Sequence, residues 1–127
     1  MIENTTLADV VLINPLVERP GAGDHVLKER FHTPPEGLCY LAACLRQRGI
    51  RARIIDAAAL GVRAGGAARS ALDSSPRMVG LTATTASVDA AAGVAAMVKQ
   101  VSPSVVTVLG GPHATLLPEE AKAHADS

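Results

Sequence analysis

The sequence predicts an α/β domain in which a parallel sheet carries helices on both faces. Four short apolar segments rich in β-branched residues alternate with four segments of helical periodicity, and such alternation gives parallel strands joined by right-handed crossovers. Glycine and proline residues separate the segments and mark the turns. The chain has 127 residues, of which 48% are hydrophobic and 2% aromatic. It is therefore expected to form one domain, residues 1–127, with a core of small aliphatic side chains.

Two strands and one helix are predicted in the first half of the chain. Residues 9–14 (DVVLIN) form a β-branched run that Pro15 ends, which is typical of a buried strand. The segment from there to Pro35 has no periodicity over about 20 residues, and loops of this length are often functional. Leucine and alanine recur at helical spacing in residues 36–48, and residues 51–56 (RARIID) alternate like a strand near the sheet edge.

The second half is predicted to add two helix–strand pairs and the start of a further helix. Residues 62–72 are alanine-rich and helical, although two glycines weaken the pattern. A strand at residues 77–83 (RMVGLTA), a helix at 87–101 and a strand at 104–109 (SVVTVL) follow. Pro118 begins the last helix, because proline fits the first turn and the two glutamates after it favour the positive end of the helix dipole.

Hydroxyl-bearing side chains follow the third predicted strand. In open parallel sheets, ligands bind outside the carboxyl ends of the strands, which makes this loop a candidate site. Thr82, Thr84 and Thr85, with Ala83 among them, could hydrogen-bond a phosphate or an amide-rich ring system. At least one of Thr84 and Thr85 is also expected to cap the next helix.

Two glycines and a histidine follow the fourth predicted strand. Gly110 and Gly111 would either let a bulky planar ligand approach the backbone or form a tight turn that needs positive φ. His113 lies in the same loop, where it either contacts the ligand or is a surface histidine that hydrogen-bonds the backbone. Both pairs of alternatives stay open.

Several common classes of site are excluded by particular residues. The sequence has no GxxxxGK[ST] loop, and no GxGxxG follows the first strand. A flavin mononucleotide loop would need hydroxyls or glycines where Pro15 stands, and a phospho-receiver would need acidic residues in place of Asn14 and Thr82. No Ser–His–Asp set or carboxylate pair is visible, so no residue is assigned a catalytic or metal-binding role. Cys39 and Cys44 are interpreted as buried helix-packing residues.

Charge and targeting features narrow the expected partners. Twelve basic residues balance twelve acidic ones, and without a basic patch or stacking aromatics no nucleic acid is expected to bind. No apolar run approaches the ~20 residues of a membrane helix, so no membrane partner is expected, and no signal peptide is found. With two cysteines and no export signal, a cytoplasmic location is expected.

Four segments carry a resemblance to a known family: DVVLINP, PPEGLCYLAACLRQRGIRARIIDA, VGLTATTASVDAA and VVTVLGGPHATLLPEEA. In order and spacing they resemble the N-terminal cobalamin (B12)-binding domain of B12-dependent radical SAM proteins. The similarity runs from Asp9 to about Ala121, and the pair GLTATT and VLGGPHAT is its most specific part. It implies a flavodoxin-like (Rossmann-like) sheet in the order 2-1-3-4-5, with a corrinoid across the carboxyl ends of the strands.

The resemblance also implies which residues hold the corrinoid. The loops after the third and fourth strands would line its nucleotide tail, and the turn after the first strand would lie beneath the corrin ring. The cofactor-binding residues expected on this basis are Asn14, Pro15, Thr82, Ala83, Thr84, Thr85, Gly110, Gly111, Pro112, His113 and Thr115.

Two departures from the family pattern shape the expected function. The DxHxxG motif of B12 domains, whose histidine binds cobalt, is not formed around His25: Asp24 precedes it directly, Gly23 stands where the aspartate would be, and Lys28 where the glycine would be. Base-off cobalamin without a protein histidine on cobalt is therefore expected. A fifth strand is not found before Ser127, and neither is the CxxxCxxC motif of the family's radical SAM barrel.

The chain is accordingly interpreted as a fragment of a larger protein that binds a corrinoid for a radical SAM methyltransferase or cyclase-type enzyme and is not itself catalytic. S-adenosylmethionine and a [4Fe-4S] cluster would belong to a radical SAM catalytic domain, present in cis or in trans. The alternative is a truncated α/β interaction or regulatory domain that no longer binds corrinoid. A third interpretation, an enzyme domain for another nucleotide, is disfavoured by the missing phosphate motifs.

Overall fold

The computed structural model describes residues 7–18 and 33–127. Within these residues, four parallel strands form one sheet in the order β2-β1-β3-β4. The strands are β1 (Val10–Asn14), β2 (Ala52–Asp56), β3 (Met78–Thr82) and β4 (Val106–Gly110). The predicted α/β class with a parallel, flavodoxin-like sheet is confirmed, and β2 lies at an edge as its sequence indicated.

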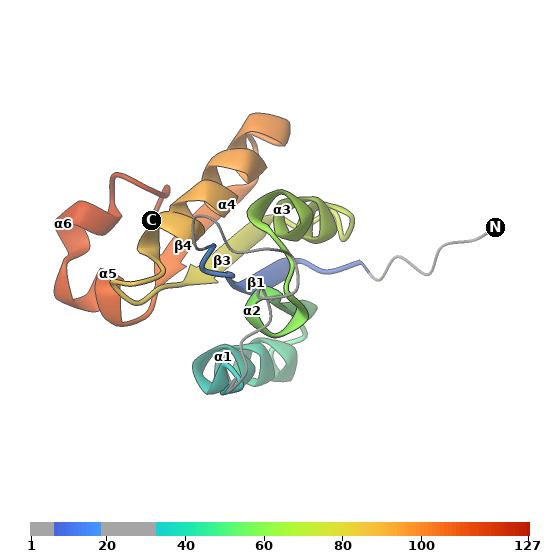
Figure 1. The fold of residues 1–127 in the computed structure, drawn as a ribbon. Coiled ribbons are helices and arrows are strands. Elements are labelled where there is room, and N and C mark those ends of the chain that lie inside the picture. Colours follow the sequence, from blue (N-terminus) through green and yellow to red (C-terminus); the bar gives the residue numbers. More distant parts are fainter. Residues whose placement is uncertain (1–6, 19–32) are drawn as a thin grey trace.

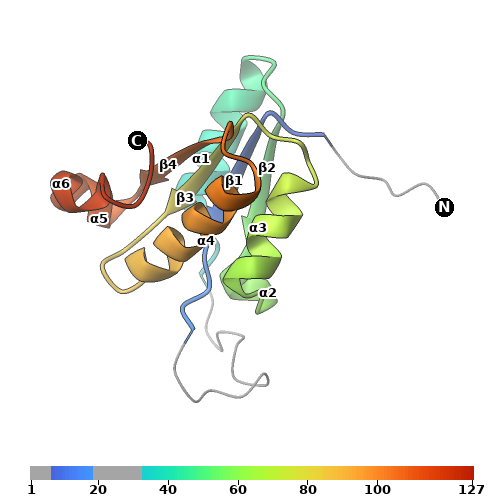
Figure 2. The ribbon, with the colours of Figure 1, turned by 90° about the horizontal axis from the view of Figure 1, so that it is seen from above.

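Helices cover both faces of this sheet, as predicted. They are α1 (Glu36–Gln47), α2 (Ala57–Leu60), α3 (Ala64–Leu72), α4 (Val88–Val101), α5 (Pro112–Leu116) and α6 (Pro118–Ala121). In Figure 1, α1 lies on one face of the sheet, whereas α3 and α4 lie on the other. Figure 2 shows α5 and α6 beyond β4, at the edge opposite β2. No helix in the described part of the chain has the length and apolar content needed to cross a membrane.

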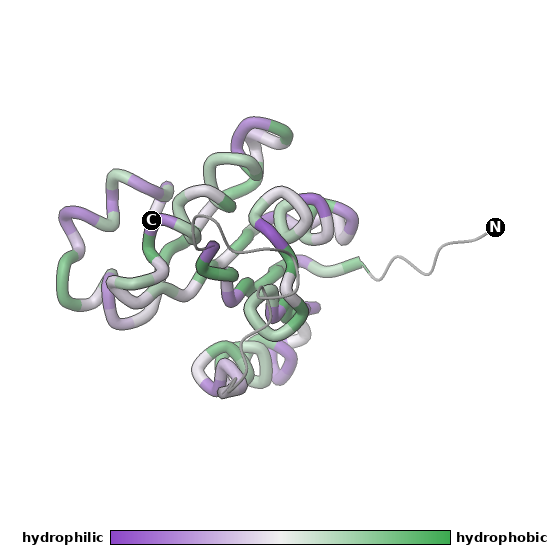
Figure 3. The backbone as a smooth tube through the Cα atoms, viewed as in Figure 1, coloured by the Kyte–Doolittle hydropathy of each residue, from purple (hydrophilic) through white to green (hydrophobic). Residues whose placement is uncertain are grey.

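The main hydrophobic core fills the space between the sheet and the α3–α4 pair. It includes the strand residues Val11, Ile13 and Val79 and the α4 residues Val94 and Val98. Figure 3 shows that hydrophobic and hydrophilic residues alternate along the helices that cover the sheet. A smaller cluster lies under α1 on the other face and contains Val10, Leu12, Leu38, Ala42 and Ala52. The α1 face of the sheet is thus the less completely packed one.

Two short helices were not predicted. α2 forms directly after β2 because the Asp56 side chain accepts a hydrogen bond from the Ala59 N–H at 3.2 Å, and Gly61 ends it with a φ of 68°. α5 begins with Pro112, which suits the first position of a helix. The segment containing His113, expected to be a loop, is therefore a helical turn.

α1 buries a narrower stripe than its sequence predicted. Leu38 and Ala42 are its buried residues, whereas Cys39 is exposed and Cys44 is half-buried. The prediction that both cysteines pack in the interior was wrong, because α1 packs mainly on β1 and β2 and leaves its other sides open.

The last residue of the chain pairs with the open side of β4. The Ser127 N–H donates to the Thr107 carbonyl at 3.1 Å, and the Leu109 N–H donates to the Ser127 carbonyl at 2.7 Å. This is the hydrogen-bond pattern of a parallel strand. No fifth strand was predicted to cover β4, and Ser127 pairs with this edge at one position.

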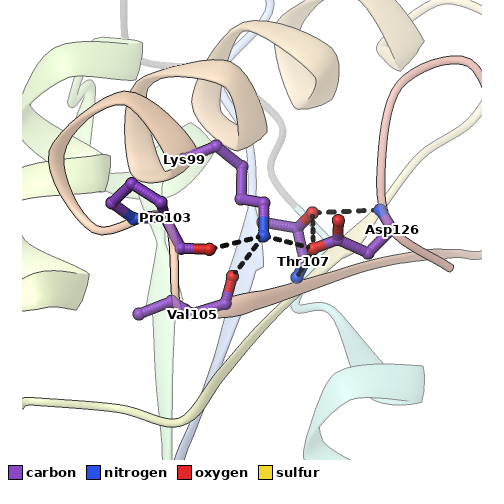
Figure 4. A network of polar contacts seen from close by, with 5 residues as sticks. All are labelled: Lys99, Pro103, Val105, Thr107 and Asp126. Carbon is purple, nitrogen blue, oxygen red and sulfur yellow. Dashed lines mark hydrogen bonds and ion pairs between the residues drawn. The ribbon is translucent and has the colours of Figure 1, made fainter.

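A network of polar contacts holds Asp126, the residue before Ser127. The Asp126 carboxylate lies 2.7 Å from Lys99 Nζ and accepts a hydrogen bond from the Thr107 N–H at 2.8 Å (Figure 4). The same ammonium donates to the carbonyls of Pro103 and Val105 at 3.0 and 2.9 Å. The hydrogen bond from Lys99, and after it that from the Thr107 backbone, lowers the pKa of Asp126. The network ties α4, β4 and the C-terminal residues together.

Candidate functional site

A groove of about 900 Å³ lies between α1 and the neighbouring face of β1, β3 and β4. It exists because α1 packs mainly on β1 and β2, while α4 packs on β3 and β4 from the opposite face. Sites for small molecules and cofactors typically measure about 300–1,000 Å³. The groove is therefore large enough for an extended ligand.

A row of three residues across the strands forms the floor of the groove. Leu12 of β1, Gly80 of β3 and Val108 of β4 are register neighbours and line it. At the centre of this row, a Cβ on Gly80 would lie 2.8 Å from Leu12 Cδ2. Glycine inside a strand often marks a place where a ligand or another backbone approaches closely. The floor is thus an apolar trough that depends on Gly80.

α1 supplies an apolar wall. Leu38 is buried, whereas Leu41 is 52% and Tyr40 75% exposed, and all three line the groove. The exposed apolar surface of these side chains can be buried against an apolar part of a ligand, and removing it from water favours binding. The wall can therefore shield such a group from water.

The carboxyl ends of the strands form the polar end of the groove. Asn14, Thr82 and Gly110 end β1, β3 and β4 and line it. Asn14 Nδ2 donates to Asp56 Oδ1 at 3.0 Å, which orients the amide. A Cβ on Gly110 would meet no atom of the described residues within 4 Å. This end of the groove therefore offers a ligand the Asn14 amide, the Thr82 hydroxyl and the backbone at Gly110.

The two glycines after β4 have different roles. Gly111 has φ 93° and ψ −174°, a region that is essentially restricted to glycine. A Cβ there would lie 2.7 Å from Thr82 Oγ1 and 2.9 Å from the Ala83 carbonyl oxygen. Gly110 has no positive φ. Gly111 therefore forms the tight turn that one interpretation of the sequence required, and Gly110 keeps the groove open.

The loop after β3 is held by its own hydrogen bonds. The Thr84 N–H donates to Ser87 Oγ at 2.9 Å, and the two hydroxyl oxygens lie 3.3 Å apart. Ser87 is the N-cap of α4, and no side chain caps this helix. The prediction that Thr84 or Thr85 caps α4 was wrong, because the chain turns once more before the helix begins. Ser87, which lines the groove beside Thr84, was not predicted.

His113 is buried between the loop after β3 and α5. Its side chain is 1% exposed, and Nδ1 lies 3.2 Å from Thr85 Oγ1. Its backbone N–H donates to the Ala83 carbonyl at 3.0 Å. The interpretation of His113 as a surface histidine that hydrogen-bonds the backbone was wrong, because α5 buries the imidazole and turns it toward the Thr85 hydroxyl. Among the described residues, Nε2 has no hydrogen-bond partner.

The groove brings together part of the predicted set of cofactor-binding residues. Its lining contains Asn14, Thr82, Ala83, Thr84, Gly110 and Gly111, whereas Pro15, Thr85, Pro112, His113 and Thr115 lie outside the lining. The apolar wall of α1 and the floor were not predicted. A signal for the floor was present in the sequence: Gly80 interrupts an otherwise apolar strand.

The residues around His25 that were compared with the DxHxxG motif, Gly23, Asp24, His25 and Lys28, lie outside the described residues. The long segment between β1 and α1 is described at its ends, residues 15–18 and 33–35. In the described part of the chain, no three His, Cys, Asp or Glu side chains are grouped so that they could hold a metal ion.

Comparison with known families decides what kind of domain this is. Residues 25–127 match the model of the B12 binding domain. The chain belongs to the B12-binding domain family. This B12-binding domain is 38% identical over 86 residues to an uncharacterized methyltransferase of Pyrococcus horikoshii, a match that covers 68% of the chain and 18% of that protein. No solved structure matches significantly.

The described residues of the B12-binding domain fit a corrinoid. Cobalamin combines a broad ring bearing amides with a tail that carries a phosphate and an aromatic base. The trough at Gly80 and the α1 wall suit an apolar base, and the hydroxyl of Thr82 suits polar groups. The bare backbone at Gly110 allows a bulky group to come close.

Proposed function

We propose that this B12-binding domain holds cobalamin, with its tail in the groove and its corrin ring at the carboxyl ends of the strands. The observation that carries the proposal is the groove, which joins an apolar trough at Gly80 to a polar end at Thr82 and Gly110. The family match supports the choice of ligand.

The apolar and the polar residues of the groove would contact different parts of the cofactor. Leu12, Leu38 and Val108 exclude water from the apolar part of the tail, and the hydroxyls of Thr82 and Thr84 hydrogen-bond its polar groups. Cobalamin, when bound, supplies methyl transfer or radical chemistry at its cobalt. The chain contributes binding and orientation, and none of its residues is proposed to be catalytic.

We also infer that no histidine of this chain binds cobalt, so that cobalamin is held base-off. Two positions of the DxHxxG pattern around His25 are occupied by Gly23 and Lys28. The His113 side chain is 1% exposed and lies beside Thr85. Electron paramagnetic resonance of the Co(II) form should show no nitrogen splitting from an axial ligand. Such a splitting would contradict the inference.

A larger methyltransferase is the proposed setting of the domain. The Pyrococcus horikoshii relative is named a methyltransferase, and the matched region covers 18% of it. We propose that a radical SAM domain, in the same chain or a partner, brings S-adenosylmethionine and a [4Fe-4S] cluster, with a cyclase-type reaction as the other option. The parallel pairing of Ser127 with β4 is compatible with a sheet that continues there.

One observation favours the alternative of an interaction domain without corrinoid. Leu116 and Leu117, at the end of α5, are 75% and 45% exposed, and Val106 on the edge strand is 41% exposed. Exposed apolar residues at a sheet edge are typical of contact surfaces.

Titration with hydroxocobalamin, followed by gel filtration and visible spectra, tests the proposal. The folded chain should retain corrin in a near-stoichiometric amount. Gly110→Leu should abolish retention, because its side chain would enter the groove at the polar end. Gly93→Leu on α4 is the matched control, since a Cβ there also meets nothing within 4 Å and Gly93 does not line the groove. A folded wild-type chain without corrin, or equal retention by both variants, would contradict the proposal.

A further inference from the structure

His113 links two loops at the carboxyl end of the sheet through a buried imidazole. Its Nδ1 lies 3.2 Å from Thr85 Oγ1, and the two residues are 28 positions apart in the sequence. Its backbone N–H donates to the Ala83 carbonyl at 3.0 Å, and the Ala83 N–H donates to the Gly110 carbonyl at 3.0 Å. These contacts hold the loops after β3 and β4 together.

The surroundings of Nε2 indicate which ring nitrogen carries the proton. Nε2 is buried, has no hydrogen-bond partner in the part of the chain that the structure describes, and lies 3.9 Å from Oε2 of Glu120. A neutral imidazole has one N–H and one bare nitrogen. A bare nitrogen facing the Glu120 carboxylate would be repelled, whereas an N–H would be attracted. The contact with Glu120 therefore favours the neutral tautomer that carries its proton on Nε2.

This tautomer determines the direction of the bond to Thr85. With the proton on Nε2, Nδ1 is an acceptor, so the Thr85 hydroxyl must donate to it. The Thr85 hydroxyl has one hydrogen. When that hydrogen is donated to His113 Nδ1, the side of the hydroxyl that faces solvent offers lone pairs alone and can act only as an acceptor. Thr85 is exposed, so a ligand at the carboxyl end of the sheet can reach it.

We propose that His113 is a positioning residue that makes Thr85 a hydrogen-bond acceptor toward the ligand. The inference rests on the proposed cobalamin-binding function and adds a selectivity to it. Amide N–H groups on the corrin ring can donate to Thr85, whereas a carboxylate at the same place would meet lone pairs and be rejected. His113 acts through Thr85 and does not itself touch the cofactor.

The tautomer can be measured without any ligand. A long-range ¹H–¹⁵N spectrum of the labelled chain should show His113 Nδ1 as unprotonated and Nε2 as protonated, with the signal assigned by its loss in His113→Asn. Thr85→Val should change the Nδ1 resonance, because the hydroxyl that donates to it is removed. A proton on Nδ1 in the wild-type chain would overturn the proposal.

Selectivity is measured with hydroxocobalamin and its separated monocarboxylic acid derivatives, in which one side-chain amide is a carboxylate. The wild-type chain should bind at least one derivative about three- to tenfold more weakly than the parent. In His113→Leu the Thr85 hydroxyl can turn outward, so this ratio should shrink toward one. His113→Asn, whose side-chain oxygen lies near the position of Nδ1, should restore it.

The outcomes separate this inference from a structural role and from the proposed function. If His113→Leu weakens all these ligands equally and leaves every ratio unchanged, His113 has a merely structural role and the inference fails. If the folded wild-type chain binds no cobalamin, the proposed function fails, and the spectrum of the free chain still decides the direction of the His113–Thr85 bond. If His113→Leu folds poorly, Thr85→Val serves as the second variant, because its position is exposed. It removes the acceptor, so the ratio of affinities should shrink toward one, and an unchanged ratio would contradict the inference.

Discussion

Replacing Gly111 by alanine should destabilise the domain, whereas replacing its neighbour Gly110 should not. At Gly111 the φ of 93° and ψ of −174° would be strained for any other residue. The added Cβ would also lie 2.9 and 3.0 Å from the backbone oxygen and nitrogen of Ala83 and 2.7 Å from Thr82 Oγ1. At Gly110 neither problem arises, because φ is not positive and nothing lies within 4 Å.

The expected size of the effect follows from these two terms. Strain in this region of backbone space costs about 1–3 kcal/mol, and an overpacked contact costs about 1–3 kcal/mol more. Gly111→Ala should therefore lower the free energy of unfolding by about 2–6 kcal/mol, out of roughly 5–15 kcal/mol for a typical domain. Gly110→Ala should raise it by about 0.5–1 kcal/mol, because alanine loses less backbone entropy on folding.

Urea unfolding followed by far-ultraviolet circular dichroism is the suitable assay, since the chain has no tryptophan and one tyrosine. The difference between the two variants should be at least about 2 kcal/mol, in the order given above. A Gly111→Ala midpoint equal to that of the wild type would refute the turn geometry. Equal destabilisation by both variants would refute the distinction between the two glycines.

Three further perturbations address other parts of the domain. The hydrogen bond from Arg51 lowers the pKa of Asp9 from 3.8 to about 2, so the stability from this pair is present above about pH 4 and is lost as the pH falls toward 2. Asp9→Asn should flatten this part of the profile of urea midpoint against pH, and an unchanged slope would contradict the assignment. Lys99→Met should lower the melting temperature by roughly 2–8 °C, because the Asp126 carboxylate and two carbonyls lose their donor. An unchanged melting temperature would show that the network is dispensable. Leu41→Glu on the half-exposed groove wall should leave folding intact and weaken hydroxocobalamin retention about tenfold, whereas equal retention would place the ligand elsewhere.

Local patterns predicted the layers of the fold because they depend on neighbours in the chain. β3 was predicted at residues 77–83 and is found at Met78–Thr82, and α4 was predicted at 87–101 and is found at Val88–Val101. Apolar runs bounded by turn residues are local properties, and so is helical periodicity. The short helices α2 and α5 were missed because four or five residues carry no periodic signal.

The polar end of the candidate site could be predicted from the sequence, whereas its apolar floor and its α1 wall could not. Thr82, Thr84 and Gly110 could be placed at one edge, because all carboxyl ends of a parallel sheet meet there. The trough at Gly80 depends on which strands α1 leaves uncovered, and that is a matter of packing between distant segments. The burial of His113 depends likewise on α5 folding back over the loop after β3.

By itself, then, the sequence determined the α/β class, the parallel sheet and the polar edge where a ligand would bind, because each follows from short-range periodicity and strand direction. Only the tertiary structure decided that the edge continues into an apolar groove, that Gly110 and Gly111 differ in role, and that His113 faces inward toward Thr85. These features arise from contacts between residues far apart in the chain, which no local pattern encodes.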